Sequence, residues 1–233
     1  MRPSLAIAVA QPACVAHDVA ANAATHATLV RRAGTRVVVF PELSLTGYEL
    51  DAEPVAPDDA RLAPVVEACR ASDAIALVGA PVPGADGRIH IASLAIDGAG
   101  SRVAYRKLWV DETEARFAPG DAPAVLTVDG WRLGLAICKD TGIARHQADT
   151  AALGIDAYVA GTLMSEAESA IQDERGRRIA TDHRVWVAFA SFAGSTGGGY
   201  DRALGRSSIW APDGTLVARA GPETGAFARA TLG

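Results

Sequence analysis

The feature of this sequence that most restricts its fold is a recurring set of short apolar segments, rich in β-branched residues and separated by turns or helical patterns. Runs of this length and composition favour buried strands. About ten strands are predicted on this basis. They cover 5–10, 36–40, 74–80, 88–96, 102–105, 124–128, 132–137, 155–161, 185–192 and 207–211.

Helical patterns occupy several of the intervals between these segments. The stretch 18–32 is rich in alanine, and 57–71 begins with two aspartates whose charges favour the positive end of a helix dipole. Helices are also predicted over 144–153 and about 164–183. Hairpin turns between antiparallel strands are predicted at the Asp-Gly pairs 86–87, 97–98, 129–130 and 213–214.

The order of these elements predicts an α/β fold. Strands that alternate with helices, with antiparallel hairpins among them, indicate mixed sheets. About ten strands are more than one open sheet holds comfortably, so we expect two packed mixed sheets with helices on their outer faces. No linker rich in glycine, serine or proline divides the chain, and residues 1–233 are therefore predicted to form one domain.

Composition argues against several classes of partner. A net charge of −5 disfavours a nucleic-acid partner, because phosphate binding requires a dense basic surface. No apolar run approaches the roughly 20 residues that cross a bilayer, so no membrane partner is expected. The three cysteines have neither metal-ligand spacing nor the even number of a disulfide framework, which favours a cytoplasmic location and no metal.

No cofactor is predicted either. The glycine-rich stretch 196–200 is expected to be a mobile loop. It does not lead from a strand into a helix, as a loop that cradles phosphate groups would.

Three predicted strands end in residues that can carry chemistry. Glu42 follows the strand that ends at residue 40, Lys107 the strand that ends at 105, and Cys138 the strand that ends at 137. Ligands of open α/β sheets gather outside the carboxyl ends of strands, so we expect these three side chains to share one rim. Lysine is scarce in this chain, and Lys107 and Lys139 are the only two.

A thiol, a carboxylate and an ammonium together make a complete nucleophilic site. A free cysteine has a pKa of about 8.5, so only a small fraction is thiolate at neutral pH. Glu42 is predicted to accept the thiol proton of Cys138, with Lys107 and the backbone N–H of Lys139 stabilising the oxyanion. The alternative for each is structural: a small buried cysteine, a glutamate that caps a turn and a surface lysine.

The segments around these residues resemble the nitrilase superfamily, the carbon–nitrogen hydrolases, over nearly the whole chain. RVVVFPELSLTGYEL (36–50) is similar to the family's glutamate segment, YRKLW (105–109) to its lysine segment and GWRLGLAICKD (130–140) to its cysteine elbow. LGIDAYVAG (153–161) and GRSSIWAPDGTLVA (205–218) resemble later strands. The resemblance implies a four-layer α-β-β-α sandwich, in agreement with the two packed sheets expected from the strand count.

The resemblance also implies a reaction. Cys138 would attack the carbon of a small amide substrate, expel ammonia or an amine, and leave a thioester for water to hydrolyse. Family members carry a second glutamate between the lysine and cysteine segments, for which Glu112 and Glu114 are the candidates here. The family's usual distance to the next phenylalanine falls between them, and we prefer Glu114. Family members usually associate as dimers or larger assemblies, so a homodimer is expected.

Departures from the family pattern bear on the substrate. Nitrile-cleaving members carry Cys-Trp-Glu at the elbow, whereas CKD (138–140) is closer to the Cys-x-Asp of amidases and carbamoylases. Carbamoylases and several ω-amidases have an arginine shortly afterwards, but TGI (141–143) supplies no cation. A small neutral or weakly polar carboxamide is therefore the leading substrate. Pocket-lining residues are predicted from their position after the lysine, cysteine and 155–161 strands: Trp109, Lys139, Thr162, Leu163 and Met164.

Two alternatives stay open. An N-carbamoyl amino acid hydrolase or ω-amidase would take its carboxylate-binding cation from Lys139 or Arg202. A non-catalytic descendant that binds a small ligand is motivated by Trp109 and by IATDH (179–183), where the family pattern is altered. Core packing is an equal alternative to pocket lining for Leu163 and Met164.

Overall fold

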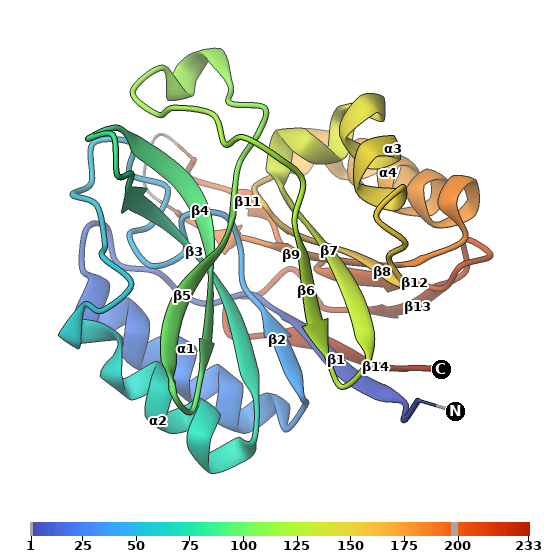
Figure 1. Ribbon diagram of the computed structural model, residues 1–233, viewed down its shortest axis with the longest axis horizontal. Coiled ribbons are helices and arrows are strands. Elements are labelled where there is room, and N and C mark those ends of the chain that lie inside the picture. Colours follow the sequence, from blue (N-terminus) through green and yellow to red (C-terminus); the bar gives the residue numbers. More distant parts are fainter. Residues whose placement is uncertain (1, 197–199) are drawn as a thin grey trace.

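The computed structural model describes residues 2–196 and 200–233. Two six-stranded sheets pack against each other, and helices cover their outer surfaces (Figure 1). The layers follow the order helix, sheet, sheet, helix, so the predicted α-β-β-α sandwich of two mixed sheets is confirmed. The predicted glycine loop includes residues 197–199, which lie outside the described part of the chain.

The first sheet has the strand order β14-β1-β2-β3-β4-β5. Its centre is parallel, because β2 pairs in parallel with both β1 and β3, and the remaining pairs are antiparallel. The strands are β1 (Leu5–Ala10), β2 (Val37–Val39), β3 (Ile75–Pro83), β4 (Ile89–Asp97), β5 (Gly100–Arg106) and β14 (Phe227–Leu232).

The second sheet has the order β13-β12-β9-β8-β7-β6, again with a parallel centre formed by β7, β8 and β9. Two very short strands, β10 (Ala193–Gly194) and β11 (Ala203–Leu204), pair separately. The strands of the sheet are β6 (Val125–Val128), β7 (Trp131–Ile137), β8 (Ala157–Thr162), β9 (Trp186–Ser191), β12 (Ser208–Trp210) and β13 (Leu216–Arg219).

The helices pack on the outer faces, two on each sheet (Figure 1). Those on the first sheet are α1 (Val19–Ala33) and α2 (Ala63–Ser72), and those on the second are α3 (Ala144–Ala151) and α4 (Ser169–His183). Short 3-10 helices lie in the connections: η1 (Ala60–Leu62), η2 (Glu112–Glu114), η3 (Cys138–Gly142) and η4 (Glu166–Glu168).

Strand periodicity separates the apolar layers. In β1, Leu5, Ile7 and Val9 face the second sheet, whereas Ala8 and Ala10 belong to the layer beneath α1 and α2. This alternation follows from the two-residue repeat of a strand, which sends successive side chains to opposite faces. Burial of each large aliphatic side chain contributes roughly 1.5–3 kcal/mol, so the sandwich gives the site a rigid support.

Each segment predicted to be a strand overlaps a strand of the structure, and the Asp-Gly pairs lie in hairpin connections. The ten predicted segments do not include β10, β11, β13 or β14, although the hairpin predicted at 213–214 implied a strand at the position of β13. β14 is an edge strand that returns to pair with β1, and its alternation of alanine with polar residues gives little hydrophobic signal. None of the helices within residues 2–196 and 200–233 is long and apolar enough to cross a membrane.

Candidate active site

Glu42 lies in the turn that follows β2, where the two sheets meet. Two glycines leave room for this turn. A Cβ atom at Gly161 in β8 would lie 2.6 Å from the carbonyl oxygen of Phe40, and one at Gly79 in β3 would overlap the backbone of Pro41. The close approach of both sheets buries the Glu42 carboxyl, which leaves the residue only 1% exposed.

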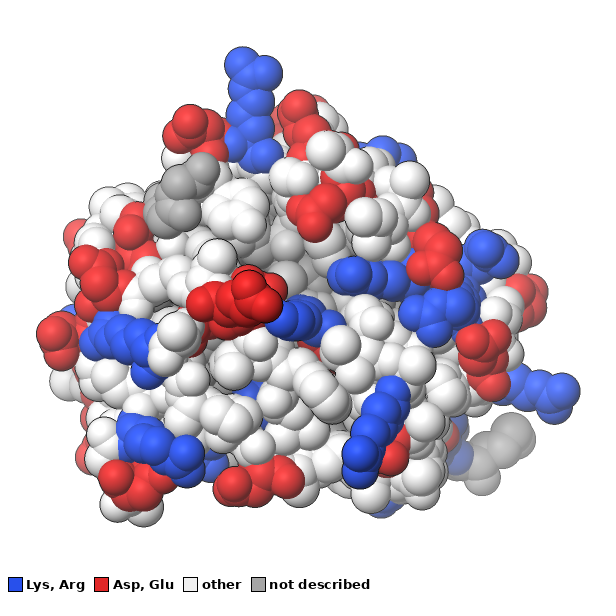
Figure 2. Space-filling model, turned by 90° about the horizontal axis from the view of Figure 1, so that it is seen from above, with Lys and Arg blue, Asp and Glu red and all other residues white. Residues whose placement is uncertain are grey.

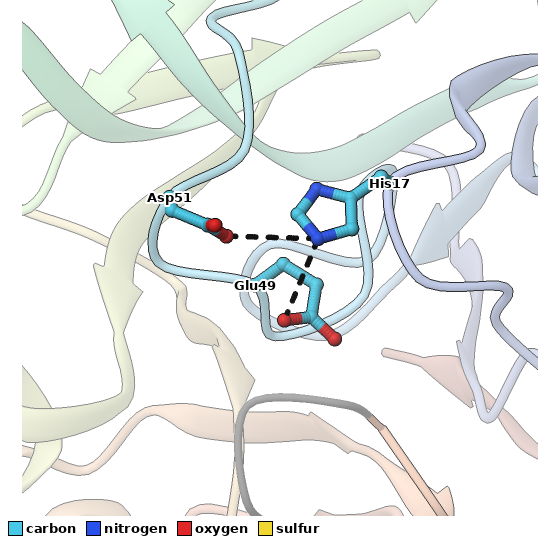
Figure 3. Close-up of side chains that lie close together, drawn as sticks. All are labelled: His17, Glu49 and Asp51. Carbon is cyan, nitrogen blue, oxygen red and sulfur yellow. Dashed lines mark ion pairs between the residues drawn. The ribbon is translucent and has the colours of Figure 1, made fainter.

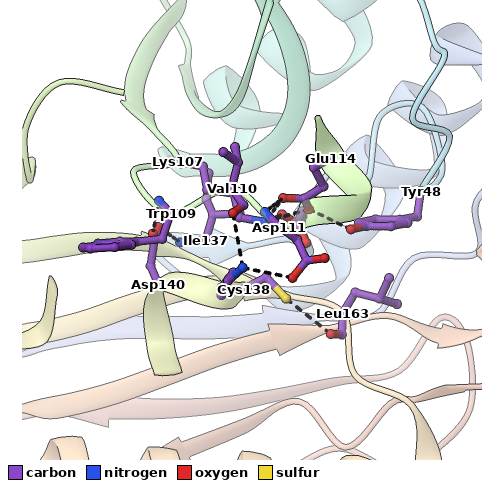
Figure 4. A network of polar contacts seen from close by, with 12 residues as sticks. Tyr48, Lys107, Trp109, Val110, Asp111, Glu114, Ile137, Cys138, Asp140 and Leu163 are labelled. Atoms are coloured by element: carbon purple, nitrogen blue, oxygen red, sulfur yellow. Dashed lines mark hydrogen bonds and ion pairs between the residues drawn. The ribbon is translucent and has the colours of Figure 1, made fainter. Parts of the chain in front are cut away.

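Lys107 follows β5, and its backbone N–H donates to the carbonyl of Ile91 in β4 at 2.8 Å. Its ammonium is buried and lies between the carboxylates of Glu42 and Glu114, the second of which is labelled in Figure 4. Nζ donates to Oε1 of Glu42 at 2.7 Å and to both oxygens of Glu114 at 2.7 Å. Lys107 therefore ties the turn after β2 to the segment after β5.

Glu114, the last residue of η2, is buried on the other side of this ammonium. Its Oε2 also accepts the backbone N–H of Asp111 at 2.7 Å, and its Oε1 accepts the hydroxyl of Tyr48 at 2.7 Å. We call Glu42, Lys107, Glu114 and Tyr48 the Lys107 cluster. The cluster joins the segment that follows β2 to the segment that follows β5 through charge-assisted hydrogen bonds.

Cys138 is the first residue after β7 and begins η3. Its φ of 41° lies in the left-handed region, which costs a non-glycine residue about 1–3 kcal/mol and is typical of functional turns. The thiol donates to the carbonyl of Leu163 at 3.4 Å. It also lies close enough to Glu42 to lower the pKa of that carboxyl, although among the described residues Oε2 of Glu42 accepts no hydrogen bond.

Burial controls the electrostatics of the site. It raises the pKa of Glu42 to about 7, an effect that the charge of Lys107 opposes and the charge of Glu114 reinforces. Burial, and next the charge of Glu42, raise the pKa of Cys138 above its ordinary range. Burial disfavours the Lys107 ammonium, but the charges of Glu42, Cys138 and Glu114 outweigh that effect and raise its pKa. The arrangement thus holds a neutral thiol beside a carboxylate able to take its proton near neutral pH.

A second buried network, which we call the Asp140 cluster, consists of Tyr105, Asp140, His146 and Tyr158. Oδ2 of Asp140 accepts the Tyr105 hydroxyl at 2.7 Å and the Ile137 N–H at 2.9 Å. His146 then bridges the two tyrosines, with Nε2 at 2.9 Å from the Tyr105 hydroxyl and Nδ1 at 2.8 Å from that of Tyr158. The network fixes the cysteine turn to β5.

Oδ1 of Asp140 extends this connection to the lysine segment, because it accepts the backbone N–H of Trp109 at 3.0 Å (Figure 4). One carboxylate therefore holds both the residue before Cys138 and a residue two positions after Lys107. Burial raises the pKa of Asp140, and its hydrogen bonds oppose that rise.

A cavity of about 220 Å³ opens beside Cys138 and the Lys107 cluster. Figure 2 views the molecule from this side and shows acidic and basic side chains next to each other rather than one basic patch. The cavity is lined by Tyr48, Lys107, Asp111, Thr113, Glu114, Cys138, Lys139, Leu163, Met164, Glu168, Arg175 and Tyr200. The sulfur of Cys138 and the Lys107 ammonium thus face one shared space of small-molecule size.

Comparison with known proteins agrees with this architecture. A model of the carbon-nitrogen hydrolase family matches residues 6–232. The chain belongs to the carbon-nitrogen hydrolase family. The predicted membership of the nitrilase superfamily is therefore confirmed, and so is the prediction that the protein is a carbon–nitrogen hydrolase. This result favours an enzyme over the non-catalytic ligand-binding alternative.

Individual relatives cover most of the chain. The chain is 33% identical over 218 residues to a Pseudomonas protegens protein named "Hydrolase in pqqF 5'region". The matched region covers 88% of this chain and 74% of that protein. Saccharomyces cerevisiae Nit3, a member of branch 10 of the nitrilase superfamily, has the same fold with a TM-score of 0.88 at 21% identity, over 98% of this chain and 90% of that one. An amidase from Nesterenkonia sp. AN1, solved in complex with butyramide, has a TM-score of 0.83 at 23% identity. That match covers 100% of this chain and 93% of the amidase chain.

In this hydrolase the structure brings Glu42, Lys107 and Cys138 together, as the strand ends suggested. Of the two candidates for the second glutamate, Glu114 contacts Lys107, whereas Glu112 faces solvent because it occupies the outer side of η2. The preference for Glu114 agrees with this geometry. Glu112 lies outside the cluster.

The predicted pocket residues divide into two groups. Lys139, Leu163 and Met164 line the cavity. Trp109 does not, since its side chain is 40% exposed and only its backbone N–H reaches the site. Thr162 is buried and donates its hydroxyl to the carbonyl of Ala190 at 3.2 Å, so it packs between strands instead of lining the cavity.

Six residues of the cavity wall were not predicted from the sequence, namely Tyr48, Asp111, Thr113, Glu168, Arg175 and Tyr200. Tyr48 and Arg175 matter most for the chemistry. Tyr48 lies within the glutamate segment, after a turn at Gly47 with a φ of 69° that brings the chain back toward the site. Arg175 lies on α4, within the helix predicted over about 164–183. A tyrosine that follows a Thr-Gly turn in the glutamate segment was the available signal for Tyr48, and nothing local marked Arg175.

One group of potential metal ligands occurs among the described residues, away from this cavity: His17, Glu49 and Asp51 (Figure 3). Nε2 of His17 lies 3.7 Å from a Glu49 oxygen and 3.6 Å from an Asp51 oxygen. His17 and Asp51 are exposed, and contacts of this length form weak surface ion pairs. We assign no metal to this group.

Proposed function

We propose that this hydrolase cleaves the C–N bond of a small carboxamide by nucleophilic catalysis at Cys138, with release of ammonia. The observation that carries the proposal is the buried Lys107 ammonium, held at 2.7 Å from both Glu42 and Glu114 at the base of the cavity that Cys138 faces. A buried base beside a nucleophile is the arrangement that activates a neutral thiol.

The first half of the reaction forms an acyl-enzyme. Glu42 takes the thiol proton as the sulfur of Cys138 attacks the amide carbon, and the carbonyl oxygen becomes an oxyanion. The C–N bond then breaks as the proton on Glu42 passes to the leaving nitrogen. Ammonia departs, and the acyl group remains on Cys138 as a thioester.

The second half returns the free enzyme. Glu42 removes a proton from a water molecule, and the resulting hydroxide attacks the thioester carbon. The C–S bond breaks, the acid product leaves, and the sulfur recovers its proton. A pKa of about 7 suits Glu42 to both roles, because the group can lose and regain a proton near neutral pH.

Two groups stabilise the oxyanion in this proposal. The three protons of the Lys107 ammonium are matched by three carboxylate oxygens, so Lys107 acts mainly through its charge. The backbone N–H of Lys139 lies in the first turn of η3, where a helical N–H has no partner within its own helix. It supplies the direct hydrogen bond.

The size of the cavity and the known ligands of related folds support a small amide. About 220 Å³ is enough for a short acyl chain. The related Nesterenkonia amidase has been captured with butyramide and, in another crystal, with acrylamide added to its active site cysteine. Short aliphatic amides are accordingly the first substrates to test.

The test is ammonia release from a panel of short amides by the wild type and by Cys138→Ala. We expect Cys138→Ala to lose turnover by at least about 10⁴-fold, because removal of a nucleophile stops the first step. Rapid quenching of the wild type followed by intact-mass measurement should find the added acyl group, and digestion of the quenched protein should place it on the peptide that contains Cys138.

Cys14→Ser is the matched control. Cys14 donates to the carbonyl of Ser44 at 3.3 Å, a bond that serine can replace, and burial raises the pKa of this thiol to about 12. The control should keep full activity. Turnover retained by Cys138→Ala, with an unchanged circular dichroism spectrum, would refute the proposal.

A further inference from the structure

A cation that the reaction does not use lies in the cavity wall. Arg175 projects from α4, is half-buried, and lines the same cavity as Cys138. The helix that carries it is firmly packed, since a Cβ atom at the adjacent Gly176 would lie 2.7 Å from the ring of Trp210 in β12. The guanidinium therefore extends from a rigid support rather than from a loop.

The charged side chains around Arg175 are already engaged. Lys107 is bound by two carboxylates, and Nζ of Lys139 pairs with Asp111 at 3.2 Å and donates to the Val110 carbonyl at 3.3 Å. Oε2 of Glu168 accepts both the N–H and the hydroxyl of Ser165 at 2.8 Å. Within residues 2–196 and 200–233, the guanidinium of Arg175 has neither a hydrogen bond nor an ion pair.

Gly142 explains why the guanidinium can lie where it does. A Cβ atom at Gly142, four residues after the nucleophile, would lie 2.8 Å from Nη2 and 2.9 Å from Cζ of Arg175. The missing side chain thus makes the space that the guanidinium fills. The segment 141–143, which supplies no cation in the sequence, receives one from α4.

We propose that Arg175 binds a carboxylate of the substrate, so that the enzyme prefers amides whose other end is an anion. The inference rests on the proposed function. A guanidinium offers two parallel N–H donors that match the two oxygens of a carboxylate. A half-buried guanidinium that has no partner is well placed to bind such a ligand. Lys139 does not fit this role because Asp111 already pairs with it, and Arg202 is exposed and does not line the cavity.

The experiment compares each ω-carboxy amide with an uncharged amide of the same shape. Succinamate and glutaramate are paired with 4-methylpentanamide and 5-methylhexanamide, in which a branched methyl pair replaces the carboxylate oxygens. The wild type should turn over the anionic member of at least one pair with the higher kcat/KM. Arg175→Gln should lower kcat/KM for that acid by about tenfold to a hundredfold and leave its uncharged counterpart within about twofold.

Two further variants separate the guanidinium from the helix. Arg177→Ala removes an exposed arginine from the same helix and should change neither substrate class. Gly142→Ala keeps the charge but displaces the guanidinium, so it should lower kcat/KM selectively for the acid. Equal losses for acid and uncharged amide in Arg175→Gln would overturn the role of Arg175 in recognition.

The substrate carboxylate could lie on the acyl chain, as in succinamate, or on the amino acid of an N-carbamoyl amino acid. A second set of assays with N-carbamoyl amino acids distinguishes these two cases. In these compounds the carboxylate belongs to the amino acid, on the second nitrogen of the carbamoyl group, and complete hydrolysis gives the amino acid, carbon dioxide and ammonia. An Arg175-dependent preference in either arm supports the inference. Hydrolysis of uncharged amides without such a preference would overturn it while the proposed function stands, and an absence of ammonia from every amide would refute the proposed function itself.

Discussion

The Lys107 cluster and the Asp140 cluster are both buried, both polar and both attached to the segment that follows β5, yet they are built differently. The first places one cation among two carboxylates, and one oxygen of Glu42 has no hydrogen-bond partner in the described chain. The second places one carboxylate among hydroxyl, imidazole and backbone donors, and both of its oxygens are bound.

This difference indicates a division of labour. A buried polar network whose groups are all satisfied is rigid, and it can hold two chain segments in register. A buried carboxylate with one unpaired oxygen is costly, and burial is the largest cause of the raised pKa of Glu42. We infer that the Asp140 cluster holds the cysteine turn in position, and that the Lys107 cluster contains the carboxylate that takes up the proton in the reaction.

The sharpest way to break this comparison is Glu42→Gln. The substitution removes the proposed base and one excess negative charge but keeps the shape of the side chain. We expect turnover to fall by about 10²–10⁴-fold. Because burial raises the pKa of Glu42 from 4.5 to about 7, the folded protein loses stability as the pH rises from about 4.5 to about 7, and the whole loss is present at pH 8. The variant lacks this ionisation and should therefore be more stable than the wild type at pH 8 by about 1–3 kcal/mol. Chemical denaturation and ammonia release measure the two effects.

Asp140→Asn should have the opposite combination. An amide cannot accept the three hydrogen bonds that Asp140 accepts, and its NH₂ would face a donor, so we expect a loss of about 1–3 kcal/mol in stability. Turnover should fall by about tenfold to a hundredfold, since the cysteine turn loses its tie to the lysine segment. The pH dependence of the residual activity should stay unchanged. A shifted pH profile would mean that Asp140 takes part in proton transfer.

The sequence predicted which residues follow the strands better than it predicted the contacts between those residues. Glu42, Lys107 and Cys138 each follow a strongly apolar strand, and an apolar run ended by one ionisable residue is a local pattern that can be read directly. The sandwich followed from strand count and turn signals for the same reason. β14 was missed because its alternating alanines and polar residues form an edge strand, where burial is only partial.

What the sequence could not predict depends on contacts between distant segments. In the sequence, nothing distinguishes Gly79 and Gly161 from other strand residues, because their role depends on the close approach of the Glu42 turn. The contact between Arg175 and Gly142 likewise joins residues from separate elements. The strained φ of Cys138 is likewise set by tertiary packing, since no local residue requires it. Trp109 was expected in the pocket from its position alone, but the backbone bond to Asp140 orients its side chain outward.

The pH dependence gives a smaller but more specific test of the Lys107 cluster. Glu42 must be ionised to take the thiol proton, and its folded-state pKa of about 7 lies above the ordinary value of 4.5. We therefore expect kcat/KM to fall about tenfold per pH unit below pH 7. Glu114→Gln removes a charge that helps to raise this pKa, so the acid limb of the variant should move to lower pH. An acid limb near pH 4.5 in the wild type would contradict the electrostatic account.

The smallest expected effect separates the two neighbouring glutamates of η2. Glu112 and Glu114 are two residues apart, but only Glu114 is buried and bound to Lys107 and Tyr48. Glu112→Gln should change kcat and KM by less than about twofold and the free energy of unfolding by less than about 0.5 kcal/mol, as expected for an exposed side chain. Glu114→Gln, the matched variant, should lose activity strongly because the ammonium loses an anionic partner. A large loss in Glu112→Gln alone would mean that η2 rotates when substrate binds and exchanges the two carboxylates at Lys107.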